Sequence, residues 1–219
     1  SLALKQKNSM IAYTYNEPYI WFEQVLETSI LAKEQGIKNV LVSNGFFNEK
    51  PWKELAPFID GVNFDFKGED DFYKNQCKGW LSPVLKSIEY AFKHNIHIEI
   101  TALIINGLND NPSFFNLLIK EISQISPQIP LHLSRYFPKR HLNISSTKKS
   151  TLLNLYDFCK EKLNFVYLGN MATFEGQQNT FCPHCKGLLI EREGAFITLS
   201  STFKKGECLD CKTKIYGVF

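Results

Sequence analysis

Val62-Asn63-Phe64-Asp65-Phe66-Lys67 is the stretch that decides the fold, because apolar and polar residues alternate along its whole length. Successive side chains of a β-strand point to opposite faces, so the three apolar residues share one face and the three polar residues share the other. Helices must cover the apolar face in a parallel βα fold, which directs the polar face inward. An ordinary α/β barrel fills its interior with branched apolar side chains, so a polar interior is unusual.

Two other predicted strands repeat this pattern and extend the polar interior. The polar members are His97, Glu99 and Thr101 in one strand and His132, Ser134 and Tyr136 in the other. Three such strands predict a barrel interior that holds a polar ligand. Two alternatives stay open: an open sheet whose polar faces meet solvent, and a salt bridge between Asp65 and Lys67 that only neutralises buried charge.

Six β-rich runs recur along the chain with amphipathic helical stripes between them, which is the rhythm of a βα fold. We expect strands at 10–15, 38–43, 61–66, 96–104, 129–134 and 164–168. The helical stripes lie at 22–30, 81–88, 115–122 and 152–159. The polar connection from Lys67 to Trp80 is longer than the others, so we expect it to be an active-site loop.

The composition excludes the disordered and fibrous classes, because 44% of the 219 residues are hydrophobic and 21% are charged. No apolar run approaches the roughly 20 residues that span a bilayer, and no signal peptide precedes Met10. We therefore expect a cytoplasmic protein without a membrane partner. The net charge of +3 is not gathered into a basic block, so nucleic acid is not the leading partner.

Four of the six cysteines form two Cys-x-x-Cys pairs near the end of the chain, and these are Cys182, Cys185, Cys208 and Cys211. Two facing knuckles supply four thiolates to one tetrahedral ion, so the pattern predicts a zinc ribbon. A rubredoxin-like iron site would use the same ligands and stays open. We divide the chain into a barrel at 1–170, a linker at 171–180 and a four-cysteine zinc ribbon at 181–219.

Three motifs follow successive predicted strands: Thr14-Tyr15-Asn16-Glu17-Pro18, Ser43-Asn44-Gly45 and Asp65-Phe66-Lys67. In this order and spacing they resemble the radical S-adenosylmethionine (SAM) enzymes. The likeness is to the branch similar to pyruvate formate-lyase activating enzymes, known as the AmmeMemoRadiSam-system radical SAM protein, and it extends over nearly the whole chain. It implies an α/β fold, a partial (βα) TIM-like barrel of the radical SAM type, followed by a small C-terminal zinc-ribbon-like unit.

The resemblance also implies the chemistry of the parent protein. In this family a [4Fe-4S] cluster binds SAM and cleaves it reductively to a 5′-deoxyadenosyl radical, which makes the parent an oxidoreductase of the activating-enzyme type. A zwitterionic ligand such as SAM is bound well by a carboxylate and an ammonium held on opposite sides of a partly dry pocket.

The cofactor-binding residues are carried over by position. The residues that match the family's motifs are Tyr15, Asn16, Glu17, Ser43, Asn44, Asp65 and Lys67. Tyr15, Asn16 and Glu17 match a Gly-Gly-Glu segment that holds the methionine amino group. Ser43 and Asn44 match the next strand end, which approaches the same amino group. Asp65 and Lys67 match an Asp-x-Lys motif whose lysine faces the methionine carboxylate. Taken alone, Asn-Glu-Pro is more often a helix start that Asn16 would cap.

Two features depart from the family pattern. The Cys-x3-Cys-x2-Cys signature of the cluster is absent, so we expect its cysteines upstream of Ser1 and expect this chain alone to be inactive. Where activating enzymes place a ligand-contacting histidine, this chain has Phe137, which leaves His132 or Tyr136 as a substitute. We assign His132 to the cofactor site and assign no catalytic residue.

Two functions are compatible with these features. The first is a radical SAM enzyme, and the alternative is a non-catalytic barrel remnant that contacts protein or nucleic acid through its ribbon. The family's name makes Memo-like and AMMECR1-like proteins candidate partners by analogy. The substrate is not readable, because one barrel serves many reactions. Neither Cys77, in the polar loop, nor Cys159, on an apolar helical stripe, is assigned to catalysis.

Overall fold

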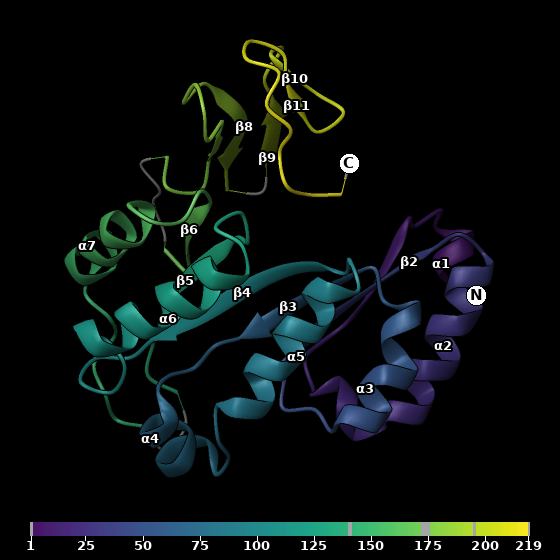
Figure 1. The fold of residues 1–219 in the computed structure, drawn as a ribbon, viewed down its shortest axis with the longest axis horizontal. Helices are drawn as coiled ribbons and strands as arrows, with labels where there is room; N and C mark the ends of the chain where they lie inside the picture. The colour runs from purple at the N-terminus through teal and green to yellow at the C-terminus, as the bar shows by residue number, and fades with distance from the viewer. Residues whose placement is uncertain (1, 140–141, 172–175, 195, 219) are drawn as a thin grey trace. The chain divides into compact units, whose positions relative to one another are not determined.

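The computed structural model describes residues 2–139, 142–171, 176–194 and 196–218. Strands β1 to β6 form a six-stranded parallel sheet in sequence order, with helices in the connections between them (Figure 1). This arrangement confirms the predicted α/β class and is consistent with a partial radical SAM barrel. Contacts concentrate in two compact units, Ser1–Ile100 and Thr101–Phe219.

The first unit contains three complete strands and the start of a fourth. Its elements are α1 (Leu2–Lys5), β1 (Met10–Tyr13), the 3₁₀ helix η1 (Pro18–Trp21), α2 (Phe22–Glu34), β2 (Lys38–Ser43), α3 (Glu49–Leu55), the 3₁₀ helix η2 (Ala56–Phe58), β3 (Gly61–Asp65), α4 (Asp70–Phe72), the π-helix η3 (Tyr73–Cys77), α5 (Ser82–Lys93) and the first half of β4 (His97–Ile104). Tyr13 of β1 pairs with Leu41 of β2, and Ser43 of β2 pairs with Phe64 of β3. These strands therefore end at one edge of the sheet.

The alternation along β3 determines which of its faces is buried. Val62, Phe64 and Phe66 are 2%, 0% and 0% exposed, whereas Asn63 and Asp65 are partly exposed. The two predicted faces of this strand are therefore confirmed. The apolar face lies among other aromatic rings, with Phe64 6.1 Å from Phe47 between ring centroids.

The second unit continues the sheet and carries the cysteine-rich tail. After β4 its elements are α6 (Pro112–Ile125), β5 (Leu131–Arg135), α7 (Lys149–Lys160), β6 (Val166–Gly169), β7 (Thr180–Phe181), β8 (Leu188–Glu193), β9 (Phe196–Leu199), β10 (Phe203–Lys204) and β11 (Glu207–Cys208). β5 and β6 are parallel, with His132 opposite Tyr167. The tail contains an antiparallel sheet of β7, β8 and β9 and a hairpin of β10 and β11.

Each predicted strand is present, and the differences are local. The first ends at Tyr13 and not at residue 15 because the backbone of Tyr15 has φ 74°, which no extended strand adopts. The connection from Lys67 to Trp80 is not a plain loop, because α4 and the π-helix η3 occupy most of it. Such π turns are frequent at functional sites, so this difference leaves the predicted role of the segment open.

The tail shares its hydrophobic core with the end of the sheet. Phe165, which precedes β6, is buried in one cluster with Leu189, Phe203 and the sulfur-bearing Cys182 and Cys208. The predicted linker at 171–180 partly falls on residues 172–175, outside the described residues, and the predicted domain boundaries remain a prediction.

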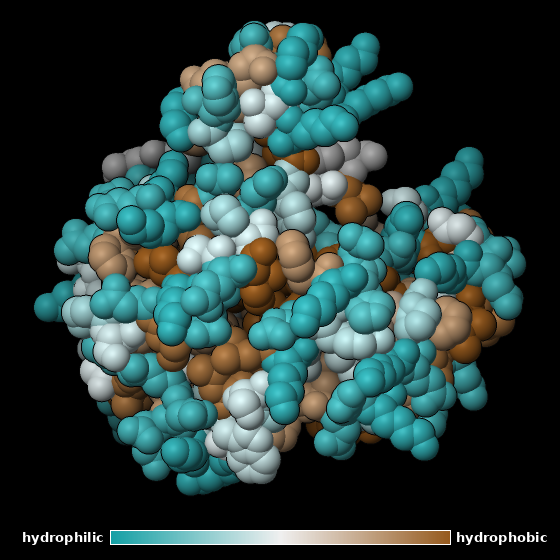
Figure 2. Space-filling view, in the orientation of Figure 1, coloured by the Kyte–Doolittle hydropathy of each residue, from teal (hydrophilic) through white to brown (hydrophobic). Residues whose placement is uncertain are grey.

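The exposed surface of the tail is rich in lysine. The exposed lysines of this segment are Lys186, Lys204, Lys205, Lys212 and Lys214, and hydrophilic residues cover much of the face that the space-filling view shows (Figure 2). Within the described ranges of the chain, no helix combines the length and the apolar character needed to cross a membrane.

Candidate functional site

The predicted cofactor residues of the first unit lie at the carboxyl ends of three neighbouring strands. Tyr13 is opposite Leu41 and Ser43 is opposite Phe64, so the segments that follow β1, β2 and β3 leave the sheet side by side. Adjacent parallel strands are about 4.8 Å apart, which brings short side chains from these segments within contact range. Ligands of α/β proteins bind at this edge.

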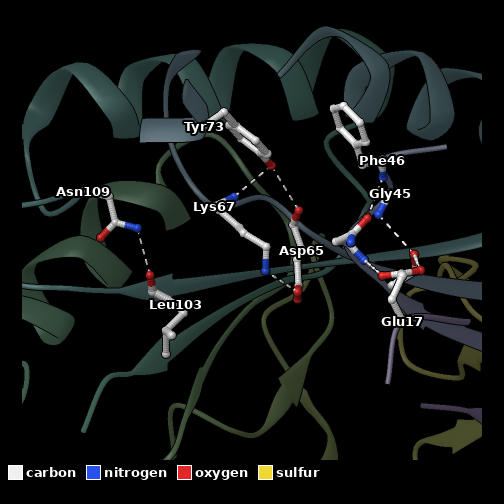
Figure 3. Close-up of polar contacts among 10 residues, drawn as sticks. Glu17, Gly45, Phe46, Asp65, Lys67, Tyr73, Leu103 and Asn109 are labelled. Atoms are coloured by element: carbon white, nitrogen blue, oxygen red, sulfur yellow. Dashed lines mark hydrogen bonds and ion pairs between the residues drawn. The ribbon is translucent and has the colours of Figure 1, made fainter. Parts of the chain in front are cut away.

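Glu17 is fixed by hydrogen bonds from the next strand end. Ser43 Oγ donates to Glu17 Oε1 at 2.6 Å, and the backbone N–H of Asn44 donates to Glu17 Oε2 at 2.9 Å (Figure 3). The carboxylate also caps η1 by accepting from the Tyr19 backbone N–H at 3.5 Å. Glu17, and not Asn16, is thus the capping residue. Donors on both oxygens hold a negative charge at a defined position.

The residues before Glu17 face solvent. The side chain of Tyr15 is 101% exposed and its backbone has φ 74°, in the left-handed region that normally favours glycine. Asn16 is also exposed. The backbone of this segment is therefore accessible beside the Glu17 carboxylate. Burial and, second, the nearby Glu17 charge raise the pKa of Tyr19, so its hydroxyl stays neutral.

Gly45 makes the turn after β2 possible. It has φ +69°, and a Cβ at this position would lie 2.9 Å from Phe64 Cδ1. Its N–H donates to Ser43 Oγ at 3.1 Å, and the Phe46 N–H donates to Asn44 Oδ1 at 2.8 Å. The tight turn therefore aims the Asn44 N–H at Glu17.

Asp65 and Lys67 form an ion pair at the end of β3. Lys67 Nζ is 2.6 Å from Asp65 Oδ2, and the two side chains are 36% and 35% exposed, the lysine first. The salt bridge of the alternative interpretation is present, but a pair so exposed is not there to neutralise buried charge. Both charges remain accessible to a ligand.

Tyr73 hydrogen-bonds to the backbone of both residues of this ion pair, and no motif in the sequence predicted it. Its hydroxyl donates to the Asp65 carbonyl at 3.4 Å and accepts from the Lys67 N–H at 3.2 Å (Figure 3). Tyr73 is only 2% exposed, and burial raises its pKa, so the hydroxyl keeps the proton that it donates. The connection also contains Phe72 and Trp80, so its sequence does not single out Tyr73.

Cys77 ends the same π-helix. Burial is the largest influence and raises the pKa of its thiol, while the charge of Lys67 lowers it and that of Asp65 raises it. Cys77 itself is exposed. Cys159 is 0% exposed, as the helical stripe predicts, and burial raises its pKa to about 12.

His132 lies in the second unit on the partly exposed face of β5. Its ring stacks on that of Tyr167, with centroids 5.3 Å apart and an interplanar angle of 27°. Tyr136, the other candidate at this position, is 6% exposed and donates its hydroxyl to the Leu142 carbonyl at 2.8 Å. Tyr136 therefore holds a loop, whereas His132 stays on the polar face.

The four tail cysteines come together as one group. All four sulfurs lie within 4.8 Å of one another, with Cys182 and Cys211 3.4 Å apart and Cys185 and Cys208 3.6 Å apart. A tetrahedral ion with metal–sulfur bonds of about 2.3 Å requires sulfurs about 3.8 Å apart. The group therefore fits one metal ion in a closed site, with all four coordination positions taken by sulfur.

This group does not fit a [4Fe-4S] cluster that binds SAM. Such a cluster needs three thiolates on three different irons and an open fourth iron, whereas these sulfurs are close enough to share one ion. Among the described residues this is the one cluster of three or more His, Cys, Asp or Glu side chains placed to hold a metal. No cluster ligand set is thus found in the described part of the chain.

Comparison with known proteins points to one family. The Radical SAM superfamily model matches residues 2–117. An uncharacterized protein of Methanocaldococcus jannaschii is 37% identical over 220 residues, covering 98% of this chain and 65% of that protein. The 7-carboxy-7-deazaguanine synthase of the same organism is 26% identical over 159 residues, covering 70% of this chain and 60% of the synthase. The chain thus spans less than two thirds of the length of either relative.

Solved structures support the fold. A domain of pyruvate-formate lyase-activating enzyme from Bacteroides vulgatus is similar with a TM-score of 0.63 at 15% identity, over 73% of this chain and 98% of that domain. A radical SAM methyltransferase from Sphaerobacter thermophilus has a TM-score of 0.61 at 12% identity, over 78% of this chain and 54% of that protein.

Proposed function

This chain belongs to the radical SAM superfamily, and from that membership we propose that the carboxyl ends of β1, β2 and β3 bind S-adenosylmethionine. The observation that carries the proposal is the Glu17 carboxylate, which receives Ser43 Oγ at 2.6 Å and the Asn44 N–H at 2.9 Å at the edge where Lys67 also emerges. A fixed anion and an accessible cation at neighbouring strand ends suit the two charges of an amino acid.

Each half of the methionine moiety has its own partner in the proposal. The ammonium is bound by Glu17 and by backbone carbonyls of Tyr15 and Asn16, whose segment is exposed. The φ of 74° at Tyr15 supports this match, because the family's motif has glycine there. The carboxylate is bound by Lys67, whose side chain is 36% exposed beside Asp65 at the end of β3. His132 is proposed as a further cofactor contact.

The parent protein is proposed to be a radical SAM oxidoreductase of the activating-enzyme type, in the AmmeMemoRadiSam branch, with Memo-like and AMMECR1-like partners. The described residues do not supply the thiolates of its cluster, so only SAM binding is assigned to this chain. The tail cysteines are proposed to bind one structural zinc ion, because a closed four-sulfur site leaves no open coordination position.

Binding of two ligands by matched variants tests the SAM site. Titration calorimetry of SAM and of 5′-methylthioadenosine, which lacks the amino acid, separates recognition of the charges from recognition of the nucleoside. We expect Glu17→Gln and Lys67→Gln each to weaken SAM binding about 10- to 100-fold, because hydrogen bonds to charged groups contribute about 1.5–3 kcal/mol. Binding of the methylthio compound should not change.

Lys53→Gln is the control, because Lys53 pairs with Glu49 on the exposed surface of α3 in the same unit. This variant should bind both ligands as the wild type does. If Glu17→Gln and Lys67→Gln also leave the SAM affinity unchanged, the two charges do not bind the amino-acid part of SAM and the site assignment is wrong.

A further inference from the structure

Arg192 of β8 joins the cysteine-rich tail to β6. Its guanidinium carbon lies 5.5 Å from the centroid of the Tyr167 ring, within the range of a cation–π contact. Arg192 Nη1 also donates to Thr180 Oγ1 and to the Gln178 carbonyl, both at 2.8 Å. Thr180 is 4% exposed and its Oγ1 is 3.0 Å from the Tyr167 hydroxyl. The arginine therefore holds both the ring and the hydroxyl of Tyr167.

Tyr167 carries this contact to the polar face of the sheet. It is the register partner of His132 in the parallel pair of β5 and β6. The two rings stack at 5.3 Å. A change in the tilt of Tyr167 therefore changes the surface on which the imidazole rests.

The strand that bears Arg192 contributes to the core around the four cysteines. Leu189 and Ile190, just before Arg192 in β8, are buried in the same cluster as Cys182 and Cys208. The tail core is small, so most of the free energy that folds it is expected to come from metal binding. Loss of the metal would release β8 and, with it, the guanidinium.

We propose that Arg192 is a positioning residue through which the metal-bound tail sets the orientation of His132. The metal ion orders β8, β8 places Arg192 on Tyr167, and Tyr167 supports the imidazole. This coupling concerns a face of the sheet and does not depend on which ligand that face binds.

Histidine NMR of the metal-loaded full chain tests the coupling. The chain has 5 histidines, and His132→Gln identifies the ring signal of His132 by its loss. We expect Arg192→Gln to move the His132 signal and to leave those of His94 and His97, which belong to the first unit. Tyr167→Phe keeps the ring but loses the hydroxyl contact with Thr180, so it should move the signal less.

Lys160→Gln is the matched control. Lys160 Nζ lies 5.6 Å from the Phe181 ring and 5.2 Å from the Tyr156 ring, so it is a cation in the same unit that contacts aromatic rings other than Tyr167. Its removal should leave the His132 signal in place. A residue that only adds stability would change the melting temperature without moving that signal.

Removal of the metal from the wild type gives a second route that needs no variant. His184 lies between Cys182 and Cys185, so its signal reports the loss of the ion. We expect chelation to move His184 and His132 together. The proposal is overturned if His132 keeps its position while His184 moves, or if a folded Arg192→Gln chain shows the wild-type His132 signal. Should Arg192→Gln fail to fold, the chelation result decides alone.

Discussion

Gly45→Ala should destabilise the first unit by more than the backbone strain of a left-handed alanine, because the new Cβ also meets neighbouring side chains. Gly45 and Gly36 have nearly the same backbone angle, φ +69° and +71°. A non-glycine residue in this region costs about 1–2 kcal/mol at either position. At Gly36 a new Cβ meets nothing within 4 Å, whereas at Gly45 it would lie 2.9 Å from Phe64 Cδ1 and 3.2 Å from Val84 Cγ1.

The Phe64 ring has little freedom to move away from that Cβ. It is 0% exposed, and the rings of Phe47 and Trp52 lie 6.1 and 6.5 Å from it between centroids. Forcing a methyl group into such packing costs typically about 1–3 kcal/mol. We therefore expect Gly36→Ala to lower the free energy of unfolding by about 1–2 kcal/mol and Gly45→Ala to lower it by about 2–5 kcal/mol.

Urea denaturation of the two variants, followed by tryptophan fluorescence and circular dichroism, measures the difference. The effect of alanine on the unfolded chain is the same in both and cancels. The same change should weaken SAM binding, because the turn aims the Asn44 N–H at Glu17. Equal loss of stability in Gly45→Ala and Gly36→Ala would refute the packing argument and leave only backbone strain.

Further outcomes follow from the metal group and the buried hydroxyl and thiols. Cys208→Ser should reduce the metal content to below about half an equivalent per chain by elemental analysis, because a tight four-thiolate site is broken; full occupancy would contradict the assignment. Tyr73→Phe should lower the free energy of unfolding by about 1 kcal/mol, whereas Tyr15→Phe, at a fully exposed side chain, should not. Thiol labelling at pH 8 should modify Cys77 and spare Cys159, since a pKa raised to about 12 leaves almost no thiolate at that pH; labelling of both in the folded chain would show that Cys159 is not buried. After reconstitution with iron and sulfide, followed by dithionite and SAM, this chain alone should form no 5′-deoxyadenosine above a no-protein control, and product above it would reveal a cluster site among its residues.

Periodicity alone predicted the elements whose burial follows a regular repeat. The alternation of β3 and the six strand positions could be predicted because each strand buries one face, or nearly both, against the rest of the fold. The π-helix at 73–77 could not, because nothing local distinguishes its hydrogen-bond pattern from that of an ordinary turn. The early end of β1 depends on the left-handed Tyr15, which the residue type disfavours.

The site divides in the same way. The motifs placed Glu17, Ser43 and Lys67 at strand ends, and parallel pairing of the strands brings these ends together. The partners that orient them come from distant or irregular segments, so Tyr73 and the stack of Tyr167 on His132 required three-dimensional structure. The cysteine spacing predicted which sulfurs meet, since each knuckle is a local turn.

The burial of Phe165 inside the tail's core has a consequence for how this chain can be divided or recombined. The ring lies just before β6 of the sheet, yet its neighbours include Leu189 and Phe203 of the tail. A deletion that stops at residue 170 would leave this ring and part of Tyr167 facing water at the end of the sheet. A tail grafted onto another protein would, conversely, lack the Phe165 ring that completes its hydrophobic core. The sheet and the tail are therefore expected to be exchanged between proteins as one module, with the strand at 166–169 inherited alongside the cysteines.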